Sequence, residues 1–230
     1  MLSLLFLGFL LGLRHALDAD HFAAIAAMTS RGLNARDAVR YGAAWGLGHT
    51  VTLFVFGGIV LLVDGVIPQA FASGLEMAVG VMLIVLGADV LRRSLRARLH
   101  YHVHKHDDKS AHFHAHSHQN DGPHEQSEHR HTHVPVLPMR ALLVGLMHGM
   151  AGTAALVLLT LDQAESLWIG LTYIALFGVG SIVGMAAVSV VISVPLNACA
   201  KRLTWLHNGL QGAIGLGTVA VGAFVLIRFA

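Results

Sequence analysis

The chain has 230 residues, of which 55% are hydrophobic and only 12% are charged. A soluble domain has roughly 25% charged residues, so this composition excludes a large soluble domain and indicates an integral membrane protein. The formal net charge of +2 is too small to suggest nucleic-acid binding, and the single cysteine excludes an internal disulfide and a metal site built from several thiolates.

Runs of about 20 apolar residues predict transmembrane helices, and the chain contains six of them. They cover residues 2–28, 39–63, 72–91, 140–161, 167–194 and 203–227. Pro68, Pro138 and Pro195 lie between these runs, where helix-breaking residues are expected. We therefore expect an all-α, polytopic protein of the cell's inner (plasma) membrane, surrounded by membrane lipid.

The first apolar run carries a group of ionisable residues near its centre. The group consists of Arg14, His15, Asp18, Asp20 and His21, and the rest of the run is uncharged. Ionisable side chains are costly in the hydrocarbon region, and by default they mark a functional site there. Imidazole and carboxylate together suit a divalent first-row transition metal. The run therefore predicts a metal site inside the membrane.

Helical geometry limits how these side chains can meet. In a regular helix His15, Asp18 and His21 lie about 60° apart in succession, whereas Asp20 lies about 140° from His15. Asp20 and His21 can join His15 at one ion only if the helix is unwound or distorted there, as transporter helices often are at binding sites. Asp18 has two interpretations, a metal ligand or a salt-bridge partner of Arg14 four residues earlier.

Three later runs each contribute one further candidate ligand. His49 lies mid-run after two glycines that let another helix approach closely, and we interpret it as a ligand. His148 is either a ligand or a buried residue among packing glycines, and Glu76 is either a ligand or an interfacial residue. His207 and Asp89 lie near helix ends and are interpreted as structural or solvated.

Basic residues predict the orientation of the chain. They border the first, third and fifth loops, whereas the second loop has none and the fourth is acidic. Both termini should therefore lie outside and the third loop should be cytoplasmic. That loop holds 12 of the 17 histidines, between His100 and His133. It has almost nothing apolar to bury, so we expect it to be disordered without metal and to bind metal, the alternative being an inert linker.

The chain also repeats itself at a nearly constant spacing. Residues 12–15 resemble 145–148, residues 41–49 resemble 173–181, and residues 74–76 resemble 209–211. Each unit has three apolar runs, so the second must enter the membrane from the opposite side. The predicted organisation is thus a 3+3 inverted repeat, a transporter feature that places the substrate site near the midplane. The first repeat covers residues 1–92, the His-rich cytoplasmic loop 93–138 and the second repeat 139–230.

This alignment also shows which polar residues occupy matching positions in the two halves. His15 and His148 occupy equivalent places, which suggests that both face the pseudo-symmetric centre. His49 corresponds to Ser181, a weaker ligand, and likewise Glu76 corresponds to a glutamine. The first half should therefore provide most of the metal ligands.

Two motifs resemble those of a known transporter family. His15, Asp20 and His21, spaced His-x4-Asp-His, resemble the signature of the nickel/cobalt transporter (NiCoT/NicO) family. The following run contains Gly-His-Thr-Val around His49, which is similar to that family's second motif. Six spans are similar to the short, urease-associated type of nickel permease. The resemblance implies nickel or cobalt permeation with these four residues handling the metal. Residues 145–155 lack the acidic residues of the longer members, which leaves the metal preference open.

Our hypothesis is therefore transport of a divalent transition metal, most simply uptake of nickel or cobalt. The candidate metal-handling residues all lie within predicted spans: His15, Asp18, Asp20, His21, His49, Glu76 and His148. The alternatives are efflux of nickel or cobalt fed by the His-rich loop, and an intramembrane metalloenzyme. We expect no enzyme, because the chain lacks the His-Glu-x-x-His motif of zinc proteases. We expect no cofactor besides the transported Ni²⁺ or Co²⁺; cytoplasmic metallochaperones are candidate partners.

Overall fold

The computed structural model describes residues 2–30, 33–63, 68–97, 138–151, 166–202 and 204–229. These residues form seven helices: α1 (Leu2–His15), α2 (Ala19–Thr29), α3 (Ala35–Val63), α4 (Gln69–Ala97), α5 (Met139–Ala151), α7 (Leu167–Arg202) and α8 (Thr204–Phe229). The regular secondary structure of the described residues is thus all helical, as expected. The His-rich loop and the second half of the fourth apolar run lie outside the described residues.

Four of these helices are long and apolar enough to cross a membrane. They contain the segments Ala35–Val60, Gln69–Arg96, Leu167–Ala200 and Trp205–Phe229. Two shorter apolar helices, Phe6–His15 and Met139–Ala151, accompany them. The protein is therefore polytopic, and α3, α4, α7 and α8 coincide with four of the predicted runs.

The first predicted run is two helices rather than one. α1 ends at His15 and α2 begins at Ala19. Between them, the amides of Leu17 and Asp18 donate to the carbonyl oxygens three residues back, at 2.9 and 3.1 Å, and Asp18 then takes an extended conformation (φ −60°, ψ 147°). The chain thus contains the break that a site shared by His15 and Asp20 requires.

One predicted helix boundary is wrong. Pro195 was expected between two runs, but it lies inside α7, which continues to Arg202. Proline is tolerated within membrane helices because neighbouring helices, side chains and local adjustments can satisfy the carbonyl it leaves free. The rule that proline ends a helix is therefore weaker here than in a soluble protein.

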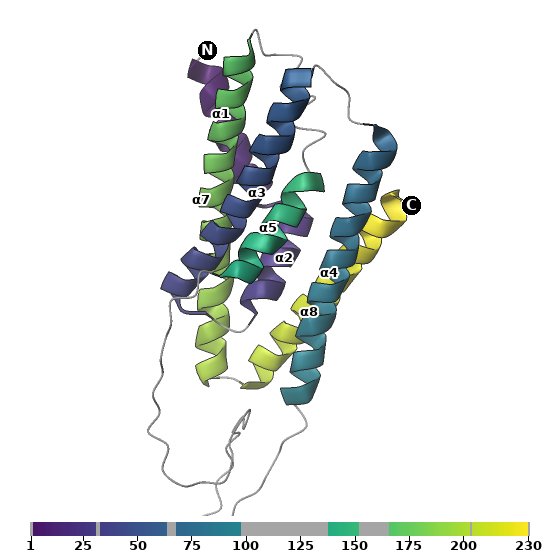
Figure 1. Ribbon diagram of the computed structural model, residues 1–230. Coiled ribbons are helices and arrows are strands. Elements are labelled where there is room, and N and C mark those ends of the chain that lie inside the picture. The colour runs from purple at the N-terminus through teal and green to yellow at the C-terminus, as the bar shows by residue number, and fades with distance from the viewer. Residues whose placement is uncertain are drawn as a thin grey trace, which may run out of the picture.

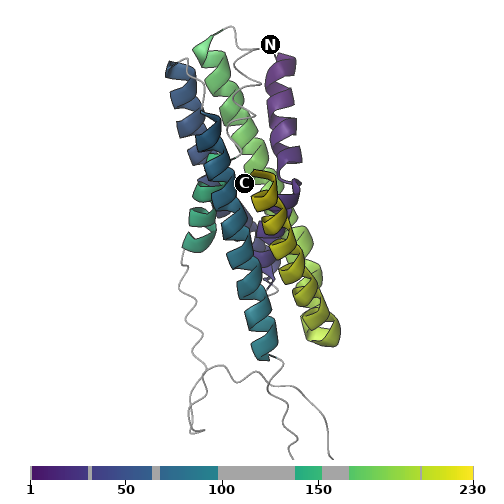
Figure 2. The same ribbon diagram turned by 90° about the vertical axis from the view of Figure 1, so that its right-hand side faces the viewer.

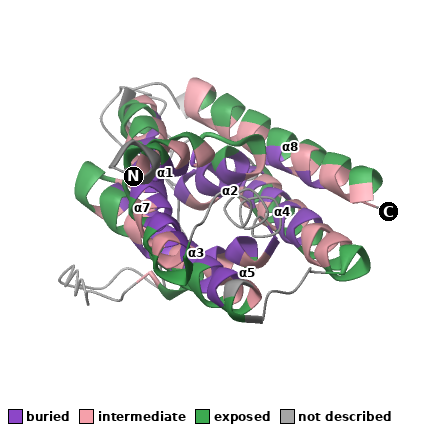
Figure 3. Ribbon diagram, turned by 90° about the horizontal axis from the view of Figure 1, so that it is seen from above, coloured by how far each residue is buried: buried purple, intermediate pink, exposed green. Residues whose placement is uncertain are grey.

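The helices pack in pairs around α2 (Figures 1 and 2). α3 packs against both α7 and α5, α1 packs against α7, and α4 packs against α8. The short α2 contacts α7, α8 and α4 and lies inside the bundle. Viewed from above, buried residues line the inward faces and exposed residues the outward faces (Figure 3). Many of the exposed residues are large and apolar, as lipid-facing positions require.

Small residues bring the helices close together around the break. Ala16, Ala23 and Ala24 are buried in one cluster with Trp45 of α3 and Met185 of α7. Small side chains at such interfaces allow close backbone approach, which drives helix association in lipid. This packing places the α1–α2 break against the middle of α3, α5 and α7.

Candidate metal centre

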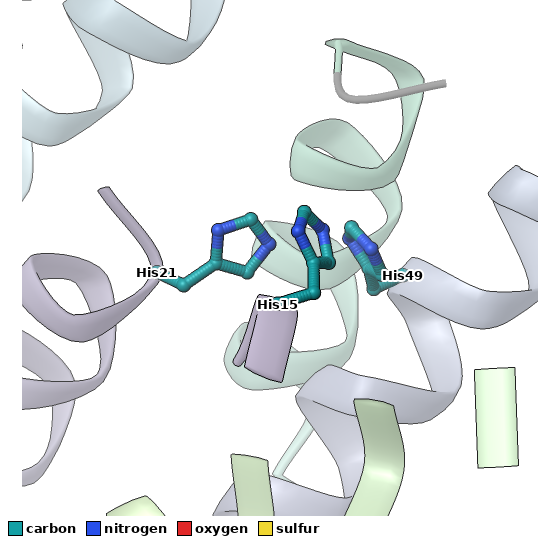
Figure 4. Close-up of side chains that lie close together, drawn as sticks. All are labelled: His15, His21 and His49. Carbon is teal, nitrogen blue, oxygen red and sulfur yellow. The ribbon is translucent and has the colours of Figure 1, made fainter. Parts of the chain in front are cut away.

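Three imidazoles from three helices meet at the α1–α2 break (Figure 4). His15 ends α1, His21 lies in the first turn of α2 and His49 lies in the middle of α3. One ligand atom of each lies within 4.8 Å of those of the other two. Donors on opposite sides of one ion are about 4 Å apart, because a metal–nitrogen bond is about 2.0–2.1 Å long. Small side-chain movements would therefore let these three residues hold one ion.

Two carboxylates orient two of these rings. His15 Nδ1 lies 2.7 Å from Asp18 Oδ2, and His21 Nδ1 lies 2.9 Å from Asp20 Oδ1. A ring protonated at Nδ1 donates to its carboxylate and leaves Nε2 as the lone-pair donor. Metal-binding histidines are commonly held in this way, and the carboxylate also raises their basicity.

The remaining nitrogens are buried without partners. Among the described residues, Nε2 of His15, Nε2 of His21 and both ring nitrogens of His49 have no hydrogen-bond partner. His49 is fully buried and His21 is 1% exposed. An unpartnered buried polar group costs free energy. Four such atoms in one cluster indicate a place built for a ligand that supplies the missing interactions.

A second group of three donors overlaps the first. Asp20, His21 and His148 also offer ligand atoms within 4.8 Å of one another. His148 comes from α5, and its Nε2 lies 3.0 Å from Asp20 Oδ2. Asp20 therefore joins His21 through one oxygen and His148 through the other. His21 is common to both groups.

Aromatic rings enclose the cluster. The ring of Trp45 lies 5.3 Å from His21 and 5.6 Å from His148, centroid to centroid, and Phe177 lies 5.3 Å from His15. Both aromatic residues are buried. The sequence had marked them only as equivalent positions of the repeat, although Trp45 precedes His49 by one helical turn. They exclude water from one side of the site and lower its local dielectric constant.

Asp18 lies at the edge of the site. Its side chain is 53% exposed and pairs with His15. Within the described part of the chain it makes no ion pair with Arg14, the partner that helical spacing suggested. Its carboxylate pairs instead with His15, three residues earlier, at the break between α1 and α2.

Glu76 lies outside both three-residue groups. It is partly buried in α4 and within electrostatic range of Asp20 and His148. Gln211, which the sequence matches align with Glu76, donates through Nε2 to the carbonyl oxygen of Ser30 at 2.9 Å, close to the end of α2. Both residues therefore lie near α2, but only Glu76 has an ionisable side chain.

The donor set limits the ions that would bind. Both groups offer imidazole nitrogen, one adds carboxylate oxygen, and neither contains a thiolate. Imidazole suits nickel, copper, zinc and iron, whereas magnesium and calcium prefer sites made of oxygen alone. The arrangement therefore fits a divalent transition metal of borderline softness.

One of the comparisons with known proteins names a metal of this class. Residues 1–228 match the family model of NicO, described as high-affinity nickel-transport protein. The chain is also 32% identical over 222 residues to the urease accessory protein UreH of Bacillus sp. (strain TB-90), covering 96% of this chain and 90% of that protein. No solved structure matches the chain. Both similarities extend well beyond the N-terminal motifs and include the second half of the chain.

Proposed function

We propose that this chain, which belongs to the NicO family of high-affinity nickel-transport proteins, moves Ni²⁺ through the histidine cluster at the α1–α2 break. The family membership confirms the resemblance noted in the sequence, and it makes the protein a transporter rather than an enzyme, with Ni²⁺ as substrate. The observation that carries the assignment of the site is the set of four unpartnered imidazole nitrogens on His15, His21 and His49.

The roles follow from which atoms are free. His15, His21 and His49 offer nitrogen lone pairs to the ion. Asp18 and Asp20 hold the first two rings through Nδ1. Asp20 also supplies negative charge inside the bundle, where the attraction between a carboxylate and a dication is far stronger than in water.

We further propose that the three helical elements of each half form an inverted repeat, with boundaries 1–92 and 139–230. Reciprocal close contacts support it. A Cβ on Gly12 of α1 would clash with the Phe177 carbonyl oxygen in α7, and a Cβ on Gly145 of α5 would clash with that of Trp45 in α3. The repeat makes these contacts equivalent, and helices that it pairs run in opposite directions (Figure 1).

The aromatic neighbours of the site follow the same symmetry. His15 lies beside Phe177, and His148 lies beside Trp45, at centroid distances of 5.3 and 5.6 Å. Each of these two histidines thus contacts an aromatic residue from the other half of the chain. These reciprocal contacts support a six-span arrangement in which the ion site lies where the two halves meet, as in other transporters with inverted repeats.

Orientation and direction follow from charge and from the relative's name. α4 ends at the end of the bundle opposite to the start of α1, and α5 begins in the half of the bundle nearer to that end (Figure 1). The basic loops should place that end, with the His-rich loop, in the cytoplasm, where metallochaperones could receive metal. Uptake is favoured because a nickel transporter that assists an enzyme, as the name of UreH indicates for that protein, must move nickel toward the enzyme's compartment.

Nickel flux in membrane vesicles tests this proposal. Right-side-out vesicles containing the protein should accumulate Ni²⁺, and everted vesicles should not. His15→Ala and His21→Ala should each abolish the flux, and Asp20→Asn should nearly do so, whereas His207→Ala, outside both donor groups, should leave it unchanged. Normal flux in any of the first three variants at normal expression would reject the site. Accumulation only by everted vesicles would instead establish efflux.

A further inference from the structure

The two donor groups overlap at His21 without merging into one site. His15, His21 and His49 form the first group, and Asp20, His21 and His148 form the second. Every donor of the first group belongs to the first half of the chain. The second group adds His148 of α5, from the second half.

The separations of the donors support two groups rather than one. Within each group the ligand atoms lie within 4.8 Å of one another, and neither group joins His148 to His15 or His49. The His21 ring lies 4.2 Å from that of His15 and 4.1 Å from that of His148, centroid to centroid, whereas the rings of His49 and His148 are 6.1 Å apart. His21 therefore lies close to both groups, whereas His49 and His148 each belong to one.

The two groups also differ in their hydrogen bonding. The first contains four nitrogens without partners among the described residues, and each of its three residues has at least one. The second contains two, Nε2 of His21 and Nδ1 of His148, but each carboxylate oxygen of Asp20 is hydrogen-bonded to an imidazole, at 2.9 and 3.0 Å. An arriving ion thus finds all three ligands of the first group free, whereas in the second Asp20 must give up a hydrogen bond to an imidazole.

We propose that these groups are two successive positions of the transported ion: Ni²⁺ binds first between His15, His21 and His49, then passes to Asp20, His21 and His148. His21 keeps hold of the ion during the transfer. The second position ties the ion to α5 and so couples its movement to the second half of the chain. This inference rests on the proposed function and extends it.

The repeat explains why the second position differs from the first. The counterpart of His49 is Ser181, whose hydroxyl donates to the carbonyl oxygen of Gly12 at 3.3 Å. The second half therefore lacks the imidazole that would complete a symmetric copy of the first position. His148 completes its ligand set instead with Asp20 and His21 of α2.

Trp45 provides a local reporter of ion binding at both positions. Its ring lies 5.3 Å from that of His21 and 5.6 Å from that of His148. The other two tryptophans, Trp168 and Trp205, are 77% and 72% exposed, so replacing both with phenylalanine leaves Trp45 as the only indole in the full chain. Because Ni²⁺ is paramagnetic, its binding beside Trp45 should quench the fluorescence.

In this background we would titrate Ni²⁺ and measure flux on the same preparations. His49→Ala removes a ligand of the first position only, and His148→Asn one of the second only. Each should keep saturable quenching, with its midpoint shifted to higher nickel concentration, yet lose flux even at saturating nickel. His21→Ala should lose both quenching and flux, and His207→Ala should keep both.

Two results would overturn the two-position path. If His148→Asn recovers full flux at saturating nickel, His148 does not lie on the path. If it loses quenching together with flux while its circular dichroism stays helical, the ion occupies one merged site. His148→Gln serves in the same assay if the Asn variant does not fold. Normal flux in His15→Ala and His49→Ala would refute the proposed function itself, whereas their loss of flux with normal flux in the His148 variants refutes only the relay.

Discussion

At the scale of single residues, the chemistry depends on which atom of each side chain remains free. A histidine whose Nδ1 is held by a carboxylate presents a fixed Nε2, and both His15 and His21 are held in this way. The two carboxylates are not equivalent, however. Asp18 is half exposed and contacts only one ring, whereas Asp20 is less exposed and joins two.

This difference predicts distinct effects of removing each carboxylate. Asp18→Ala should raise the nickel concentration for half-maximal flux by about 10–100-fold, because His15 loses its orienting partner, and leave the maximal flux nearly unchanged. Asp20→Asn should instead remove most of the maximal flux. Concentration-dependent Ni²⁺ flux in vesicles measures both quantities. Asp89→Ala, which removes an exposed carboxylate paired with Arg93, is the control for lost charge and should behave as wild type. Complete loss of flux in Asp18→Ala at every concentration would make Asp18 a direct ligand.

Ligand chemistry also predicts metal selectivity. Imidazole and carboxylate without thiolate favour nickel and cobalt, with zinc next, over copper(I), and they disfavour calcium and magnesium. In a cobalt-uptake assay, nickel should compete most strongly and calcium should not compete. Strong competition by calcium with none by nickel would contradict the ligand set.

Part of this centre could be predicted from the amino-acid sequence, because placing ionisable side chains in the hydrocarbon region of a membrane costs free energy. His15, Asp20 and His21 stand out since nothing but function justifies such residues in an apolar run. The partner of Asp18 could not be predicted, because a regular helix places both Arg14, four residues earlier, and His15, three residues earlier, within reach of its carboxylate. Likewise, spacing could not assign His148 to Asp20, since that contact joins α2 to α5 across the bundle.

At the scale of helices, the site depends on how closely α5 approaches α3. Three glycines lie directly against the backbone of the facing helix: Gly145 against Trp45, Gly149 against His49, and Gly48 against Leu142. A side chain at Gly145, one turn before His148, would push α5 outward and carry His148 with it. The helix interface and the ligand geometry therefore depend on the same glycines.

Gly145→Ala should consequently destabilise the protein and impair transport together. Forcing a methyl group into such an interface costs about 1–3 kcal/mol, so the thermal unfolding midpoint in detergent should fall and nickel flux should decrease. Gly217→Ala is the matched control, because a Cβ at Gly217 of α8 meets nothing within 4 Å. Equal unfolding midpoints and fluxes for the two variants would show that the α3–α5 contact is not critical.

The sequence was a good guide to helices and a poorer guide to their ends. The broken first run could be anticipated, because Asp20 and His15 lie on different faces of an unbroken helix. The continuation of α7 through Pro195 could not, because it depends on neighbouring helices rather than on local preference. Element type follows from composition, whereas breaks follow from packing.

At the scale of the whole molecule, the two halves of the chain supply different numbers of metal donors. α1, α2 and α3 supply every donor of the cluster except His148. The second half instead supplies α7, which packs against α1 and α3, and α8, which packs against α4. The sequence matches predicted that the first half would supply most of the ligands, but the contact between His148 and Asp20 could be found only from the packing of α5 against the first half.

In the proposed inverted repeat the His-rich loop has no counterpart, because it would join the two halves as an insertion. Replacing residues 100–133 with a Gly/Ser linker of equal length should therefore leave the protein folded and permeable to nickel. It should lower the metal bound per molecule at equilibrium, because 12 imidazoles are lost, and weaken the response at low free metal. Equilibrium dialysis and vesicle flux at limiting and saturating nickel measure these effects.

The pH dependence of metal binding should distinguish the loop from the intramembrane site in the same experiment. An unperturbed imidazole has a pKa of about 6.5 and binds metal only when neutral. The extra metal held by the intact chain over the linker variant should therefore be present above about pH 7 and disappear below about pH 6. If the linker variant inserts normally but shows no flux at saturating nickel, the loop belongs to the transport path. In that case the cluster at the α1–α2 break is only one part of a longer route for the ion.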